Sequence, residues 1–469
     1  MFKYAALAAA LALPLAALPA TSSASTTIPT TTAKAVSRTA AVTPAAAAPV
    51  YADWPGYHGG GLKSGYAPTV KHPTTTPKLT LSLPLDGAVY AQPVVVDHGI
   101  KIVATENNTV YRIANGAVVW KLHIGPAVPR SALPCGDIDP LGITGTPDYD
   151  PTTNTVIVVS EVSSPIRHVA TGLNPVNGSV KWQRNVDVPS SVTGIDPSAM
   201  QERGGLLVVG RRVYIPYGGL AGDCASYRGS VVGVDLDHPT TAALWHFTVP
   251  TSREAGIWGP PGAVAAPGGG ILVAVGNGAT AESGTYDYSD SVLKLANQQI
   301  QDSFSPSVWR QDNANDLDLG SQGPLVVGNW VFIAGKNGMA YLLRRGKLGG
   351  IGGQVSQLNL CKSFGGAAVA GDLVYVPCTD GIRALRVNDN GTMTPLWHAT
   401  ANITGTPTLA GGLVWALDTG AGVLHALRPN NGQDVYSLSV GAVSRFAAPA
   451  AYGNGVLVGT LAGVKAFGW

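Results

Sequence analysis

The sequence predicts an all-β protein, an eight-bladed β-propeller of four-stranded antiparallel blades whose ring is closed by an N-terminal strand. Three observations indicate this fold. One sequence phrase returns about every 40 to 60 residues along the chain. Each copy contains short β-branched or alternating strands separated by Asp-Gly, Asn-Gly or Gly-Gly turns, which is typical of antiparallel meanders. The repeat region also begins and ends with complementary parts of one copy.

The recurring phrase starts with a Gly/Pro-rich segment and continues through an apolar strand, a turn, a second strand and a third strand that ends near a tryptophan. Helical periodicity is nearly absent. Because a four-stranded meander cannot bury both faces alone, the copies must stack, and radial stacking produces a propeller. Seven copies begin near Tyr90, Ile143, Glu202, Ile257, Leu319, Phe364 and Ile403.

The two ends of this repeat region determine the expected number of blades. An eighth copy, 446–469, has three strands and then stops without a closing strand. The segment 78–85 (KLTLSLPL) precedes the first copy and has the pattern of an unpaired closing strand. We therefore expect it to pair with the last copy and complete eight blades. Seven blades are the alternative, because the copies between Ile257 and Leu360 are irregular.

The N-terminus predicts export. Residues 1–24 have an early lysine, an apolar run and small residues suited to signal-peptidase cleavage after Ala20 or Ala24. Residues 25–50 are rich in Thr, Ala and Pro and predict a disordered tether, so the propeller is expected to occupy 51–469. No later stretch reaches the length of about 20 apolar residues that a membrane helix requires. We expect a secreted protein, extracellular or in the cell envelope.

The composition limits the classes of partner. Charged residues make up 12% of the chain and the net charge is +2, which does not support nucleic-acid binding. So few carboxylates would suit an acidic milieu, although compositional drift would look the same. Four cysteines in an exported chain suggest two disulfides. Cys361 and Cys378 flank a short stretch with a turn and a returning strand, so we expect them to pair.

The Trp-closed repeat, together with the segment YADWPGYHGG at 51–60, resembles the pyrroloquinoline-quinone (PQQ) propeller family, and the likeness covers nearly all of the chain after Val50. Several segments resemble cofactor-facing parts of the quinoprotein methanol and alcohol dehydrogenases. Non-catalytic propellers share the same repeat, so individual residues must decide the function.

The resemblance implies roles for four residues. It places Trp258 under the planar cofactor, Asn277 as a calcium ligand, Asp318 as the catalytic base and a calcium ligand, and Lys336 at the quinone oxygens. Ordinary structural roles are the alternatives: Trp258 can pack between blades and Asn277 can be a turn residue. Asp316 competes with Asp318 for the catalytic role.

The chain also departs from the family pattern. Cys135 falls where the family has two adjacent cysteines that cap the quinone, but Gly136 follows it, so any cap at Cys135 differs from the family's. An ordinary structural disulfide is the alternative for Cys135, and we expect it to pair with Cys224 across the mouth of the site. Where the family has an acidic calcium ligand the chain has only Asp223.

Three functions are compatible with these residues. The first is a PQQ- and calcium-dependent oxidoreductase that acts on a small alcohol-type substrate. It would pass electrons to an external acceptor, since the chain has no Cys-x-x-Cys-His haem motif. The second is a non-catalytic binding or assembly propeller. The third is a hydrolase on the same scaffold, similar to the tetrathionate hydrolases.

Overall fold

The computed structural model describes residues 53–279, 284–400 and 402–469. The expected signal peptide and tether lie outside these residues. The described residues all belong to one compact unit and are nearly all β, in agreement with the predicted fold class.

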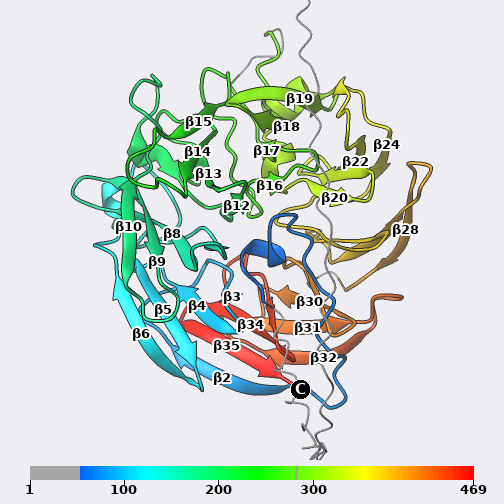
Figure 1. Cartoon of the computed structure of the whole chain (residues 1–469). Coiled ribbons are helices and arrows are strands. Elements are labelled where there is room, and N and C mark those ends of the chain that lie inside the picture. Colours follow the sequence, from blue (N-terminus) through cyan, green and yellow to red (C-terminus); the bar gives the residue numbers. More distant parts are fainter. Residues whose placement is uncertain (1–52, 280–283, 401) are drawn as a thin grey trace, which may run out of the picture. The chain divides into compact units, whose positions relative to one another are not determined.

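Eight antiparallel sheets of four main strands follow one another around a ring in chain order (Figure 1). Blade 1 contains β3 (Val94–Val96), β4 (Ile100–Ala104), β5 (Thr109–Ala114) and β6 (Ala117–His123), and blade 2 contains β7 (Asp148–Asp150), β8 (Thr155–Val162), β9 (Arg167–Leu173) and β10 (Val180–Asn185). Blade 3 contains β12 (Leu207–Val209), β13 (Arg212–Gly219), β14 (Ser230–Asp235) and β15 (Trp245–Thr248), and blade 4 contains β16 (Val264–Ala265), β17 (Ile271–Val275), β18 (Ser291–Ala296) and β19 (Gln299–Ser305).

The second half of the ring repeats this arrangement. Blade 5 contains β20 (Leu325–Val327), β21 (Trp330–Ala334), β22 (Met339–Arg344) and β24 (Ser356–Asn359), and blade 6 contains β25 (Ala368–Ala370), β26 (Leu373–Val376), β27 (Arg383–Val387) and β28 (Met393–His398). Blade 7 contains β29 (Thr408–Ala410), β30 (Leu413–Asp418), β31 (Val423–Leu427) and β32 (Asp434–Ser439), and blade 8 contains β33 (Ala450–Tyr452), β34 (Gly455–Thr460), β35 (Gly463–Gly468) and β2 (Lys78–Pro84).

Short additional elements lie between and beside the blades. The added strands are β1 (Tyr66–Ala67) beside β29, β11 (Met200–Gln201) beside β13 and β23 (Gly350–Ile351) beside β19. The helices are η1 (Tyr57–Gly59), η2 (Arg130–Ala132), η3 (Pro197–Ala199), α1 (Trp309–Ala314) and η4 (Leu319–Ser321).

The ring closes as expected. β2 pairs antiparallel with β35, with Leu81 opposite Ala466, and Figure 1 shows the two strands side by side. Leu81 is buried in the blade, whereas the side chain of Leu79 is 52% exposed. The prediction of eight blades is therefore confirmed, and the seven-bladed alternative is wrong.

The core lies between neighbouring blades rather than inside any one of them. Val110 of blade 1 and Val158 of blade 2, for example, are fully buried in one shared cluster. All eight residues of β8 are buried, while the outer strand β10 alternates between exposed and partly buried residues. Burial of both faces of the inner strands explains why their sequences run continuously apolar, and it holds adjacent blades together.

Both expected disulfides are present. Cys135 bonds Cys224 and Cys361 bonds Cys378, with Cα atoms 6.1 and 5.8 Å apart. No cysteine in the described part of the chain is free. In the same residues, no helix is long and apolar enough to cross a membrane.

Candidate functional site

One position of the repeat recurs in the segment that leads into each blade. It stands four residues before the first strand of the blade in seven blades and six residues before it in blade 4. Five of its eight occupants line a single cavity, which therefore lies where the blades converge. The eight residues are Tyr90, Thr144, Arg203, Trp258, Ser321, Phe364, Thr404 and Phe446.

This axial cavity has a volume of about 500 Å³, within the range of small-molecule sites. Aromatic and charged side chains from six blades and their connections form most of its wall. Those that the chemistry below uses are Trp258, Asn277, Asp316, Asp318, Lys336, Phe364, Arg203, Arg445 and Phe446.

The segment 53–65 closes the far end of the axis. Tyr57 is buried there, beside a space of only about 20 Å³ below the axial cavity. Gln92 of blade 1 anchors the segment by accepting a hydrogen bond from the backbone nitrogen of His58 (2.8 Å). Nζ of Lys63 donates to a carbonyl oxygen of blade 3, 2.7 Å away. The segment is thus bonded to the lead-in segments of blades 1 and 3.

Asp318 is the most heavily bonded carboxylate of the cavity. It precedes η4, is 2% exposed, and forms an ion pair through Oδ2 with Nζ of Lys336. Its Oδ1 accepts hydrogen bonds from the backbone nitrogen of Asn277 (2.8 Å) and from Nε1 of Trp258 (3.3 Å). With its amide nitrogen turned toward Asp318, the Asn277 side chain donates to Oδ1 as well, at 2.7 Å. Blades 4 and 5 are thus tied together at this carboxylate.

Close approach of two backbones makes this arrangement possible. Asn277 stands two residues after the end of β17, and Gly276 precedes it. A Cβ atom at Gly276 would lie 2.1 Å from Oδ1 of Asp318 and 3.0 Å from the indole nitrogen of Trp258. Only glycine leaves room for the carboxylate here.

Lys336 is held from two sides. It stands two residues after β21, where its backbone nitrogen donates to the Asp318 carbonyl oxygen (2.9 Å). Its Nζ donates to Oδ1 of Asp316 (2.8 Å) as well as to Asp318, and it lies 5.6 Å from the centre of the Trp258 ring. The ammonium is therefore fixed over the indole between two carboxylates.

Burial and charge set the protonation of this pair. Burial raises the pKa of Asp318, and the bonds from Lys336 and from the backbone of Asn277 oppose the shift without cancelling it. Burial works to lower the pKa of Lys336, but Asp318 and Asp316 outweigh it, so the pKa is raised. Lys336 is thus cationic, and Asp318 is a stronger base than an exposed aspartate.

The part of the cavity wall next to Trp258 is aromatic and basic. Phe364 and Phe446 lie 6.5 and 6.2 Å from Trp258 between ring centres. The guanidinium of Arg445 lies over both phenylalanine rings, at 4.4 and 5.1 Å, and that of Arg203 lies 5.1 Å from Phe446. Arg203 faces Asp137 at 3.7 Å, whereas Arg445 makes no ion pair with any residue that the structure describes. This wall suits a flat, anionic ligand.

The structure thus brings Trp258, Asn277, Asp318 and Lys336 into one cavity, as expected, while their chemical roles stay predictions. Cys135 is not among the residues that line the cavity. Its sulfur would lie 3.4 Å from a Cβ atom at Gly222, so the disulfide packs against a residue of the cavity wall without lining the cavity itself.

Sequence reasoning missed the basic and aromatic wall. Arg203, Phe364 and Phe446 occupy the same repeat position as Trp258, and Arg445 immediately precedes Phe446. Alignment of the eight lead-in segments would have been the signal, because equivalent repeat positions face the same part of the axis.

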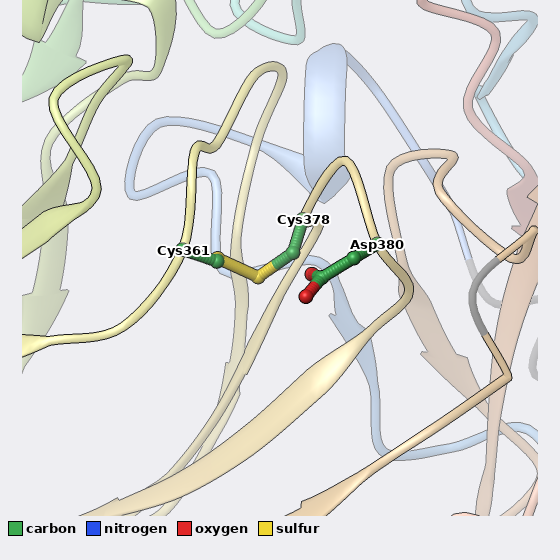
Figure 2. A group of neighbouring side chains, drawn as sticks. All are labelled: Cys361, Cys378 and Asp380. Atoms are coloured by element: carbon green, nitrogen blue, oxygen red, sulfur yellow. A yellow bond between two sulfur atoms is a disulfide. The ribbon is translucent and has the colours of Figure 1, made fainter.

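One other cluster of side chains has the composition of a metal site. Cys361, Cys378 and Asp380 have potential ligand atoms within 4.8 Å of one another. Figure 2 shows that the two sulfur atoms are bonded to each other, and Asp380 pairs with Arg383. Since metals bind cysteine as free thiolate, this disulfide excludes the cluster as a metal site.

Comparison with known proteins supports the fold. No protein-family model matches the chain, and no curated protein matches it either. A quinohemoprotein alcohol dehydrogenase, ADHIIG of Pseudomonas putida HK5, is 14% identical with a TM-score of 0.64 over 89% of this chain and 80% of its own. BamB of Moraxella catarrhalis is 15% identical with a TM-score of 0.59, and the computationally designed protein Ika8 is 12% identical with a TM-score of 0.52. Each of these two aligns with 84% of this chain and 100% of its own. Likeness at such low identity concerns the fold alone: the chain has the eight-bladed fold of the PQQ-type propellers.

Proposed function

We propose that this chain is an exported oxidoreductase of the quinoprotein type, which binds PQQ in the axial cavity and oxidises an alcohol-type substrate. The observation that carries the proposal is the Asp318–Lys336 ion pair beside Trp258, inside a cavity that aromatic and basic side chains also line. Two disulfides are in keeping with export.

The residues of the cavity fit the chemistry of PQQ, which is flat and carries three carboxylates. Trp258, Phe364 and Phe446 offer apolar surfaces for its rings. Arg203 and Arg445 offer guanidinium groups for its carboxylates.

When bound, PQQ supplies an ortho-quinone that accepts the hydride of the alcohol carbon. Asp318 accepts the proton of the substrate hydroxyl, because burial makes it a stronger base and it lies in the cavity wall. Lys336 holds the carboxylate in position and stabilises its charge. An external acceptor takes up the two electrons.

Two measurements test this proposal. PQQ titrated into the purified protein should quench tryptophan fluorescence to saturation, and an artificial dye should then be reduced in the presence of alcohols. Asp318→Asn should lower turnover about 10²- to 10⁴-fold and change PQQ affinity little, because the amide keeps the shape of the side chain but removes the base. Asp389→Asn, at an exposed turn, is the matched control. Full turnover by Asp318→Asn would remove Asp318 from the mechanism.

A hydrolase acting on a small dianion is the second candidate. Arg445, which no described carboxylate neutralises, favours an anionic substrate of the tetrathionate type. Asp318 would then act as the base for water. Turnover of tetrathionate at acid pH without PQQ would support this candidate, and absence of both PQQ binding and tetrathionate turnover would leave the binding or assembly propeller.

A further inference from the structure

We infer that the ammonium of Lys336 takes the place of the divalent metal ion in this cavity, so that the site works without calcium. This departs from what the resemblance to quinoprotein dehydrogenases implies. The inference depends on the proposed function only for the identity of the cofactor.

The first argument is the set of groups around Asp318. Calcium binds six to eight oxygen ligands. The groups that donate to Asp318 include Lys336, the indole of Trp258 and the backbone nitrogen of Asn277. Each of these presents a hydrogen atom rather than a lone pair. Both carboxylate oxygens are therefore already satisfied by donors.

The second argument is the orientation of Asn277. As a calcium ligand, the side-chain oxygen of this residue would have to point at the ion that Asp318 binds. Only the opposite orientation forms hydrogen bonds here, with the amide nitrogen 2.7 Å from Oδ1 and 3.3 Å from Oδ2 of Asp318. In this orientation Asn277 is a donor that positions a carboxylate; in the other, its side-chain oxygen faces Asp318, as that of a calcium ligand would.

The third argument concerns blade 3, where the family has an acidic calcium ligand. Asp223, which stands where the family has its acidic ligand, accepts a hydrogen bond from the hydroxyl of Tyr227. The cavity does not gather a third free carboxylate at Asp318.

The position of Lys336 supplies the positive charge instead. Its Nζ forms ion pairs with both Asp316 and Asp318 and lies over Trp258. A calcium ion between the two carboxylates would have to displace this ammonium and break its ion pairs with both of them. A cation that is attached to the chain cannot be removed by a chelator.

Terbium luminescence tests the inference without any need for PQQ, because Tb³⁺ replaces Ca²⁺ in oxygen sites and is excited by a nearby tryptophan. The wild-type chain should show no saturable sensitised luminescence. Lys336→Ala leaves Asp316, Asp318 and Asn277 facing one space, and it should acquire a saturable site. Lys347→Ala, an exposed lysine of the same blade, is the control. Adding Trp258→Phe to Lys336→Ala should weaken the signal if the ion lies in this cavity.

PQQ binding provides the second test of whether the site needs calcium. Treatment of the wild type with EDTA should change its PQQ affinity less than twofold, whereas Lys336→Ala should bind at least tenfold more tightly in millimolar calcium than in EDTA. A saturable terbium site in the wild type, or loss of wild-type PQQ binding in EDTA with recovery in calcium, would overturn the inference. So would a Lys336→Ala variant that circular dichroism shows to be folded but that gains no terbium site; Lys336→Gln repeats this test if the alanine variant does not fold. A wild type that binds no PQQ would refute the proposed function, while the terbium arm still decides between metal and ammonium.

Discussion

Blades 5 and 7 have the same four-stranded meander, but they use a buried aspartate in opposite ways. In blade 7, Asp418 is the last residue of β30, and its side chain bonds to the turn that follows. Its Oδ1 accepts hydrogen bonds from the backbone nitrogens of Gly420 (3.0 Å) and Ala421 (2.8 Å). In blade 5, Asp318 is bonded by groups of blade 4 and by Lys336 of the following turn. One aspartate stabilises its own turn, and the other joins two blades inside a cavity.

The difference also appears in the pKa values. For Asp418, burial acts to raise the pKa, but the hydrogen bonds from Ala421, Asn402 and Gly420 outweigh it and lower the pKa. For Asp318, burial prevails and the pKa is raised. A carboxylate satisfied by its own turn has a structural role, whereas one held by side chains from another blade is a candidate for chemistry.

The two disulfides also contrast a contact between distant parts of the chain with a local one, and their removal should have the largest effect on stability. Cys135–Cys224 closes a sequence separation of 89 residues and Cys361–Cys378 one of 17. If disulfides act mainly on the entropy of the unfolded chain, replacement of both cysteines by alanine should cost about 4–5 kcal/mol for the long loop and about 3 kcal/mol for the short one. Guanidinium unfolding measures both free energies. Equal costs, or the reverse order, would contradict the entropic account.

Two matched glycines give the next test. Gly276→Ala places a Cβ atom 2.1 Å from Asp318, so we expect a loss of about 1–3 kcal/mol in the free energy of unfolding, together with loss of PQQ binding. Gly420→Ala meets Asp418 at 3.4 Å, an ordinary contact, and should change stability by less than about 0.5 kcal/mol. Thermal and guanidinium unfolding compare the two variants. A tolerated Gly276→Ala would mean that blades 4 and 5 can separate at the site without penalty.

Most of the fold could be predicted from the sequence because the repeat is a local pattern. Turn residues and strand alternation mark each blade, and the unpaired segments at 78–85 and 446–469 predicted the closure that β2 and β35 form. Cys135 and Cys224 could be paired because both belong to loops on one side of the ring.

The site could be predicted only in part. Asp318, Lys336, Trp258 and Asn277 were identified by resemblance, and the structure brings them together. The lead-in position marks Phe364 and Phe446 as axial residues, but the contact of Arg445 with both rings depends on a meeting of blades 6 and 8, which the repeat alone does not specify. Closure of the far end by 53–65 depends likewise on the path of the chain across the ring.

Glu106 extends the contrast to a carboxylate that a neighbouring blade holds through hydrogen bonds, with no ion pair to a described residue. It stands in blade 1, two residues after β4, in the position that corresponds to Lys336 in blade 5. Its Oε2 accepts hydrogen bonds from the backbone nitrogen of Gly142 (2.8 Å) and from Oγ1 of Thr144 (3.1 Å), in the segment that leads into blade 2. Burial raises the pKa of Glu106 from 4.5 to about 8 and prevails over these bonds and over the charge of Arg203, while the charge of Glu161 adds to the increase.

A raised carboxyl pKa stabilises the fold at low pH and destabilises it as the pH rises, because the folded chain must then bury a charge that the unfolded chain exposes. The contribution of Glu106 is complete below pH 4.5 and is lost as the pH rises to about 8. Glu106→Gln keeps an oxygen acceptor for Gly142 and Thr144 but cannot titrate. We therefore expect the melting temperature of the wild type to fall between pH 5 and pH 8 by about 2–4 °C more than that of the variant.

Asp418→Asn should behave in the opposite way. Because the pKa of Asp418 is lowered, its stabilising contribution is lost only as the pH falls below 3.8. The melting temperatures of the wild type and of Asp418→Asn should therefore converge at acid pH. Melting curves recorded across this pH range for all three proteins measure both effects, and parallel curves for the wild type and Glu106→Gln would show that Glu106 is ionised in the folded chain at no cost.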